Sequence, residues 1–259
     1  MAPLAACTKA PTEHNTPMAT ETTRRAQRPS GDTYRYQTLR PLNNLVFILP
    51  MLGAFQVGAF FYGTNLLATH HLRAVLEYFG ATAPVLPGAL VASALLVQHL
   101  IRRDSWRLQP KVLAGMLGES IVWMAPLIVM IGLLGRMQAG LHTEPADLLQ
   151  ETLQAFGAGI YEEFIFRLVF ISLVLLISVD IFGLKREPVT VAAVLLAAVA
   201  FSLYHLSPAQ LEGTCPIAWT ETVFRAVAGI YLGTLYVFRG FGITVGAHSL
   251  YNIYAIACQ

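Results

Sequence analysis

The sequence is poor in charged residues. Only 12% of its 259 residues are Asp, Glu, Lys or Arg, whereas 55% are hydrophobic. Because a soluble domain is usually about one quarter charged, this composition excludes an ordinary soluble protein and is typical of a polytopic membrane protein. The formal net charge of +2 is not gathered into a patch that would bind nucleic acid. We therefore expect the lipid bilayer, and no nucleic acid, among its partners.

Cysteine is also scarce. The chain has three cysteines, Cys7, Cys215 and Cys258, and their spacing matches no metal-binding motif. We interpret them as small apolar side chains, with a Cys215–Cys258 bridge as the alternative. The chain lacks the His-Glu-x-x-His helix that supplies two zinc ligands at once. We therefore predict no metal and no cofactor.

Long apolar segments dominate what remains, and segments of this length predict transmembrane helices. We expect an all-α polytopic membrane protein with a bundle of about seven spans. The expected spans are 42–62, 84–101, 112–134, a fourth helix that contains 157–170 and ends near Phe182, then 189–206, 218–238 and 241–258. Between the first two, residues 63–83 read as an amphipathic segment that lies at the membrane interface.

The ends and loops of the chain differ in composition. Residues 1–40 are rich in Thr, Pro, Ala and Arg without apolar periodicity, which predicts a disordered N-terminal tail. Basic residues recur in this tail, in the 102–111 loop, at 185–186 and at Arg239, and the connectors between them are poor in Lys and Arg. By the positive-inside rule, we expect a multi-pass protein with its N-terminus in the cytoplasm. We expect the membrane to be the bacterial cytoplasmic membrane.

Three charged residues lie close together in the fourth span, whose only other charge after them is Asp180. Residues 157–170 read GAGIYEEFIFRLVF and contain Glu162, Glu163 and Arg167. Each charge near the centre of a transmembrane helix costs roughly 2.5–3.5 kcal/mol, so we expect internal partners. Glu163 and Arg167 are four residues apart with the acid first, which favours a helical ion pair. Glu162 points about 100° away and is left as a candidate general base.

Polar residues also occupy two later spans. His205 follows Phe201 by four residues at the end of the fifth span, and Asn252 follows His248 by four in the seventh. This spacing places the members of each pair on one helix face. A lone helical histidine is more often a packing residue than a catalyst. Ionisable groups on three apolar spans together indicate a shared functional site.

These residues form three motifs in a fixed order. The motifs are Glu-Glu-x-x-x-Arg, Phe-x-x-x-His and His-x-x-x-Asn, at Glu162, Glu163, Arg167, Phe201, His205, His248 and Asn252. In these positions the sequence resembles the CPBP family, the CAAX prenyl proteases and bacteriocin-processing membrane endopeptidases, also called the Abi family. The resemblance covers about residues 157–254, and the N-terminal half carries no family signature.

The resemblance implies an intramembrane endopeptidase of the glutamate type. It implies that Glu162 activates water with the help of His205, and that His248 and Asn252 stabilise the oxyanion. Glu163, Arg167 and Phe201 would support the site. The implied substrate is a peptide or protein at the membrane that is membrane-associated, lipidated or leader-bearing. Residues 41–152 would then hold the N-terminal transmembrane helices and connectors, and 153–259 the CPBP-like catalytic bundle.

Two other functions fit the same residues. Glu162, His205 and His248 would make a two-histidine, one-glutamate zinc set with an open fourth position, and chelator sensitivity separates that zinc-dependent protease from the glutamate type. A non-catalytic membrane protein, acting in immunity or as a scaffold, is the alternative from another class. A degenerate member is expected to lose one of the four polar residues, and all four are present here.

Overall fold

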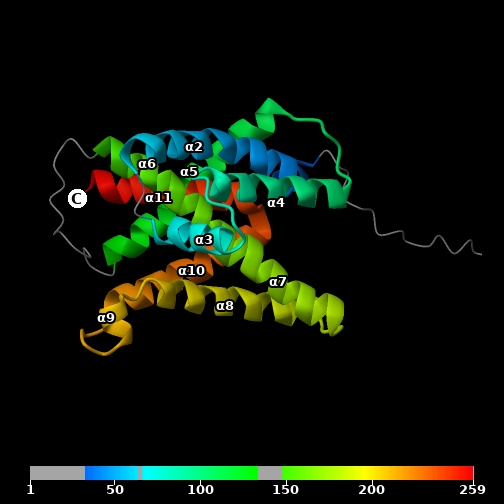
Figure 1. The fold of residues 1–259 in the computed structure, drawn as a ribbon. Coiled ribbons are helices and arrows are strands. Elements are labelled where there is room, and N and C mark those ends of the chain that lie inside the picture. The colour runs from blue at the N-terminus through cyan, green and yellow to red at the C-terminus, as the bar shows by residue number, and fades with distance from the viewer. Residues whose placement is uncertain (1–32, 64–65, 134–147, 259) are drawn as a thin grey trace, which may run out of the picture.

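The computed structural model describes residues 33–63, 66–133 and 148–258, and all regular structure within them is helical (Figure 1). The helices are α1 (Tyr34–Thr38), α2 (Pro41–Tyr62), α3 (Leu67–Tyr78), α4 (Leu86–Arg102), α5 (Pro110–Leu133), α6 (Leu148–Glu163), the π-helical η2 (Phe164–Ile171), α7 (Ser172–Leu175), the π-helical η3 (Leu176–Ile181), α8 (Arg186–Tyr204), α9 (Pro208–Leu211), α10 (Trp219–Arg239) and α11 (Phe241–Ala257). The predicted all-α class is therefore confirmed.

Four helices are long and apolar enough to cross a membrane. They are α2, α5, α8 and the continuous run Leu148–Ile181, while α4 is a shorter apolar helix. Large apolar side chains such as Phe60, Leu133 and Ile181 are exposed on them, and lipid is the solvent that accommodates such surfaces. The chain is thus an integral membrane protein with several spans. All seven expected spans are helical, but their number as spans stays a prediction because α4, α10 and α11 are not among the four.

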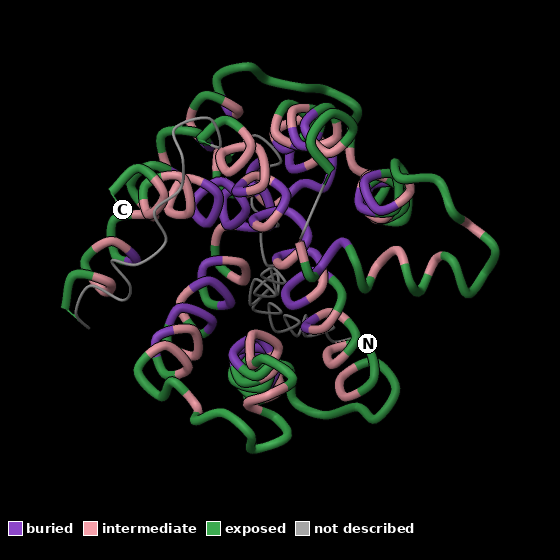
Figure 2. Tube along the Cα trace, turned by 60° about the vertical axis from the view of Figure 1, so that its left-hand side comes forward, coloured by how far each residue is buried: buried purple, intermediate pink, exposed green. Residues whose placement is uncertain are grey.

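Helix α11 lies at the centre of the bundle. Residues 241–249 are all buried, and the helix packs against α2, α5, α6 and α10. Figure 2 shows the buried stretches converging in the middle of the molecule. A helix that faced lipid or water on one side would show a stripe of exposed residues there. The last expected span is therefore a core helix over its first half, and this position lets it present side chains to a site formed by several helices.

Small residues allow α11 to approach its neighbours closely. A Cβ atom at Gly159 of α6 would overlap the Ser249 hydroxyl and lie 3.0 Å from the Ser249 backbone nitrogen. A Cβ at Gly246 of α11 would lie 2.8 Å from Cβ of Ser120 in α5. Helix pairs in membranes commonly use small residues in this way, because they allow the backbones to come together. The contact at Gly159 also brings α11 beside the Glu162–Glu163 turn.

The predicted N-terminal tail ends earlier than expected. Residues 34–38 form α1, and Arg40 is buried rather than part of a disordered basic segment. The Arg40 guanidinium donates hydrogen bonds to Gln37 Oε1 at 2.6 Å, Ser105 Oγ at 3.1 Å and the Arg107 carbonyl at 3.2 Å. These acceptors replace water around the charge. Residues 1–32 of the predicted tail lie outside the described residues.

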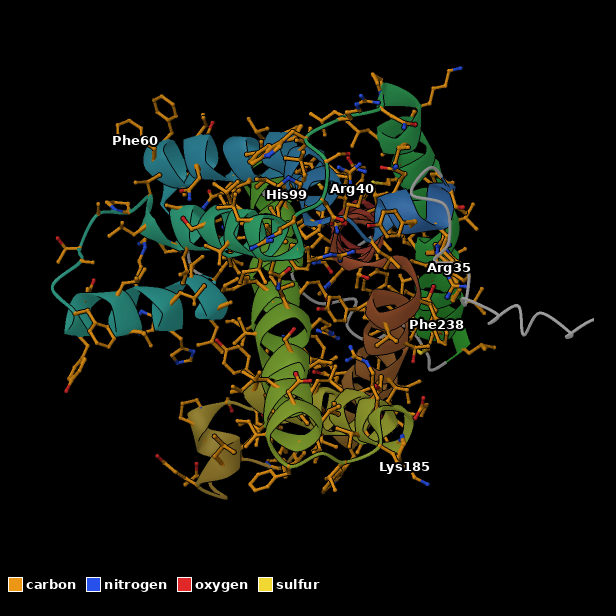
Figure 3. All side chains as sticks on the ribbon, turned by 90° about the vertical axis from the view of Figure 1, so that its right-hand side faces the viewer. Arg35, Arg40, Phe60, His99, Lys185 and Phe238 are labelled. Atoms are coloured by element: carbon orange, nitrogen blue, oxygen red, sulfur yellow. The ribbon has the colours of Figure 1, made fainter. Side chains whose placement is uncertain are left out.

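Two of the predicted basic segments meet at one end of the bundle. Arg102 donates to the Leu39 carbonyl at 2.9 Å, and the loop after it contacts Arg40 as described above. Figure 3 shows Arg35 and Arg40 at the opposite end of α2 from Phe60. The described part of the basic tail and the 102–111 loop therefore lie at the same end of the bundle, as the distribution of basic residues in the sequence predicts. Which end faces the cytoplasm stays a prediction, as does the N-terminal orientation.

The predicted amphipathic segment 63–83 contains α3. Ala68 and Thr69 are buried on its inner side, and it packs against α4 and α6. His71 Nδ1 lies 2.6 Å from the Tyr204 hydroxyl at the end of α8. Helix α3 is therefore attached to the end of α8, immediately before the site residue His205.

Candidate active site

The paired glutamates lie where an α-helix becomes a π-helix. Helix α6 ends at Glu163, and η2 continues the same run from Phe164. Wider π-helical turns are rare and occur often at functional sites. Glu162 and Glu163 are consecutive and so point in different directions. The Glu163 side chain is fully buried, whereas that of Glu162 retains 15% of its exposed surface.

Glu163 connects two helices. Its Oε2 lies 3.1 Å from Arg167 Nε, the ion pair expected from their spacing, and both side chains are buried. Its Oε1 accepts a hydrogen bond from His248 Nδ1 at 2.7 Å. Arg167 also donates to the Gly229 carbonyl of α10 at 3.4 Å. Glu163 and Arg167 thus both have internal partners, and Glu163 orients the His248 ring.

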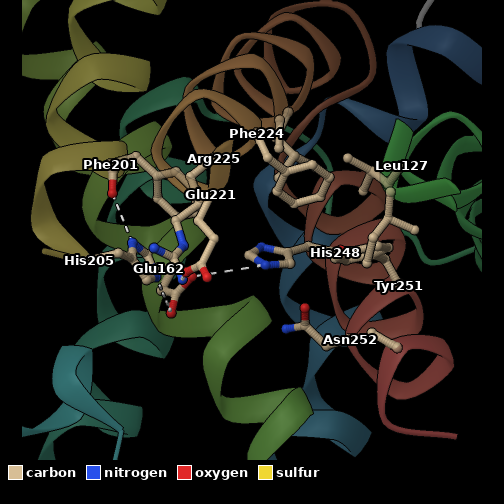
Figure 4. Close-up of a pocket in the computed structure, with 14 residues that line it drawn as sticks. Leu127, Glu162, Phe201, His205, Glu221, Phe224, Arg225, His248, Tyr251 and Asn252 are labelled. Atoms are coloured by element: carbon tan, nitrogen blue, oxygen red, sulfur yellow. Dashed lines mark hydrogen bonds and ion pairs between the residues drawn. The ribbon is translucent and has the colours of Figure 1, made fainter. Parts of the chain in front are cut away.

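Glu162 faces two imidazole rings (Figure 4). His205 Nε2 lies 3.7 Å from Glu162 Oε1, and His248 Nε2 lies 3.9 Å from Glu162 Oε2. Both distances exceed a direct hydrogen bond. A carboxylate accepts through two oxygens with about four lone-pair positions. Glu162 therefore keeps acceptor positions for a molecule that enters between it and the histidines.

The second nitrogen of each histidine is held by an acceptor. His205 Nδ1 lies 2.8 Å from the Phe201 carbonyl, and His248 Nδ1 contacts the Glu163 carboxylate as described above. Because a carbonyl and a carboxylate oxygen only accept, each Nδ1 carries the hydrogen. The Nε2 atoms of both rings consequently face Glu162. Such a bond to the remote nitrogen is the usual way in which a tautomer is selected.

The Phe201 ring packs between the Arg167 guanidinium and the two imidazole rings of the site. Arg167 Cζ lies 4.6 Å from the ring centroid, a cation–π contact. The ring meets His205 edge to face with the centroids 4.8 Å apart, and His248 with the centroids 6.3 Å apart. Phe201 therefore contributes its ring and its carbonyl, and it positions both histidines.

All four residues predicted to act in catalysis line one cavity of about 290 Å³. They are Glu162, His205, His248 and Asn252, from α6, the end of α8 and α11. Apolar side chains of α5 and α10, including Leu127, Phe224 and Leu232, form much of the remaining wall. The structure thus brings together groups up to 90 residues apart in the sequence. A cavity lined by apolar side chains and a few convergent polar groups is the usual form of a reaction site.

Two features of this cavity were not predicted from the sequence. Glu163 was assigned only to Arg167, but it also bonds His248, 85 residues away. The pair Glu221 and Arg225, four residues apart on α10, also lines the cavity. Their spacing predicts an ion pair. Their position in the cavity could not be predicted, because it depends on which face of α10 packs against α11.

The described residues also bear on the predictions for metal binding and for the cysteines. Within the described ranges no group of three or more His, Cys, Asp or Glu side chains has an arrangement suited to a metal ion. Cys215 and Cys258 are both free and exposed, so the alternative bridge is not formed and neither is a buried apolar side chain. Cys7 lies outside the described residues.

Comparison with known families points to the same part of the chain. Residues 145–254 match the family described as Type II CAAX prenyl endopeptidase Rce1-like. The chain carries an Rce1-like domain. This confirms the CPBP resemblance, which covered about 157–254, and the Rce1-like domain contains every residue of the three motifs. No curated protein and no solved structure gave a significant match. Residues 145–254 are thus similar to a family of membrane proteases.

Proposed function

We propose that the Rce1-like domain is an intramembrane endopeptidase in which the Glu162 carboxylate activates water. The observation that carries the proposal is the position of Glu162 in the cavity. It faces Nε2 of His205 and of His248 at 3.7 and 3.9 Å, with no direct hydrogen bond to either. A general base needs the atom that carries the reacting proton within about 2.6–3.2 Å. A water molecule between these groups meets that condition.

The reaction then follows from the groups in place. Glu162 takes one proton from water as the water oxygen adds to the peptide carbonyl carbon. His205 Nε2, directed at Glu162 by the bond from Nδ1 to the Phe201 carbonyl, assists this proton transfer. The C–N bond then breaks, and the amine leaving group receives the proton that Glu162 removed. The products are a new carboxylate and a new amino terminus.

The developing oxyanion requires donors that the cavity supplies from α11. The Asn252 amide donates without any change of charge. His248 already gives its Nδ1 hydrogen to Glu163, so it donates through Nε2 only when both ring nitrogens carry hydrogen. The Glu163 carboxylate provides a counter-charge to such an imidazolium. Preorganised donors of this kind are usually the largest single contribution to catalysis of acyl transfer.

Cleavage by the purified protein in liposomes tests the proposal, with a panel of fluorogenic peptides, prenylated and plain. Glu162→Gln keeps the shape of the side chain and removes the base, so kcat is expected to fall by about 10²–10⁴-fold. Glu163→Gln is the matched control, because it makes the same chemical change one residue away. It is expected to lower the melting temperature more than Glu162→Gln does.

A chelator separates the two protease mechanisms. Cleavage that resists the chelator and is lost in Glu162→Gln supports the glutamate mechanism. Cleavage that is lost on chelation and restored by zinc assigns Glu162, His205 and His248 to a metal site instead. If the wild type cuts no peptide of the panel while Glu162→Gln and wild type melt alike, the result favours the non-catalytic alternative.

A further inference from the structure

The cavity that contains Glu162 is also lined by a cationic side chain, Arg225, which takes no part in the proposed reaction. Glu221 and Arg225 line the wall formed by α10, on the helix face that continues with Ala228 and Leu232. Among the described residues that line the cavity, Arg225 is the only lysine or arginine. Figure 4 shows Arg225 and Glu221 extending from α10 on the side of the cavity where His205 lies. A charge in this place needs an explanation, because the neighbouring wall residues Phe224, Ala228 and Leu232 of α10 are apolar.

The pair with Glu221 uses only part of the Arg225 guanidinium. Arg225 Nη2 lies 3.2 Å from Glu221 Oε2, and this contact involves a single nitrogen. A guanidinium has five N–H donors in a planar fork. The Arg225 side chain remains 30% exposed, and Glu221 is 19% exposed. A purely structural pair between helix turns would not require the guanidinium to face the cavity.

We propose that Arg225 is a specificity residue of this site and binds a carboxylate of the peptide substrate, with Glu221 holding the guanidinium in place. The inference rests on the proposed function, since it assumes that a peptide enters the cavity. Arginine is the side chain best matched to a carboxylate, because two parallel N–H groups meet the two oxygens. The carboxylate is either the C-terminus of the substrate or an acidic side chain near the bond that is cut. Either source presents the same group to Arg225.

Binding measured without cleavage tests the assignment. The probes are fluorescent peptides from the cleavage panel in three forms: a free C-terminal acid, the corresponding C-terminal amide, and that amide with one internal glutamate. Anisotropy is measured with Glu162→Gln in detergent, so that no peptide is consumed. One or both carboxylate forms are expected to bind at least about tenfold more tightly than the plain amide, as a charge-assisted pair warrants.

Arg225→Gln in the same background is expected to abolish that preference while leaving binding of the plain amide unchanged. Arg225→Lys keeps the positive charge but lacks the planar guanidinium, so it is expected to lose most of the preference for the carboxylate peptides. If Arg225→Gln melts at a much lower temperature than the parent, Arg225→Lys replaces it in the test. Arg186→Gln is the matched control, because Arg186 is an exposed arginine of α8 that does not line this cavity. It should preserve the preference.

The outcomes are distinct. Loss of preference for the free acid identifies a C-terminal carboxylate, and loss of preference for the internal glutamate identifies an acidic side chain. Equal weakening of all three forms in Arg225→Gln shows a structural residue and overturns the proposal, as does the absence of any carboxylate preference before substitution. Failure of the proposed function is read separately, because it appears as a wild type that does not cleave, whether or not carboxylate binding depends on Arg225.

Discussion

The contact between Gly159 and Ser249 allows a direct test of how helix packing sets the site. Gly159→Ala adds one methyl group where α6 meets the buried helix α11. The new Cβ would overlap the Ser249 hydroxyl and would lie 3.0 Å from the Ser249 nitrogen and 3.1 Å from its Cβ. Ordinary contacts begin at about 3.4 Å. Because Ser249 is fully buried, its hydroxyl has no open space, and α11 must move away from α6.

The size of the effect follows from these distances. The backbone contact alone requires a shift of about 0.4 Å, and the hydroxyl contact requires more than about 1 Å. Overpacking of this kind costs about 1–3 kcal/mol. His248 precedes Ser249, so the shift also displaces its ring from Glu162 and Glu163. A misplacement of about 1 Å in a catalytic geometry lowers rates by about 10²-fold, and we expect kcat to fall by about 10- to 100-fold.

Thermal unfolding in detergent and cleavage kinetics measure the two effects, and Gly118→Ala is the matched control. Gly118 lies within α5, and a Cβ there meets nothing within 4 Å, so that variant reports only the preference of a helix for alanine. Ser249→Gly combined with Gly159→Ala removes the side-chain overlap but keeps the contact with the backbone nitrogen, so it should restore part of the loss relative to Ser249→Gly alone. If Gly159→Ala matches Gly118→Ala in both assays, the close packing of α6 on α11 does not position the site.

Two further substitutions test single contacts. Arg167→Met leaves the buried Glu163 carboxylate without its cation and is expected to cost about 3–5 kcal/mol, seen as a lower melting temperature; an unchanged temperature would show that the pair contributes nothing. Tyr204→Phe removes the hydroxyl that contacts His71 and should weaken the attachment of α3 by about 1 kcal/mol. Hydrogen exchange would then be faster over 67–78 than in wild type, and equal exchange rates would contradict this role.

Local features of the site could be predicted from sequence because they depend on spacing along one helix. Glu163 and Arg167 pair as their four-residue separation requires, and Phe201 contacts His205 by the same spacing. The order of the three motifs was enough to identify the family of the domain. Low charge and long apolar segments were enough to predict an all-α membrane protein. None of these inferences needs to know which helices are neighbours.

Contacts between helices were decided only by the tertiary structure. Hydropathy does not distinguish a residue that faces lipid from one that faces protein, so α11 read as an ordinary span although residues 241–249 are buried on every side. The bond from His248 to Glu163 and the place of Arg225 in the cavity both depend on how helices are rotated about their axes. The same holds for Arg40, which reads as tail sequence until Gln37, Ser105 and Arg107 surround it. Sequence therefore determined which residues were available for chemistry, and packing decided which of them meet, because rotation and close approach of helices are set by side chains distant in the chain.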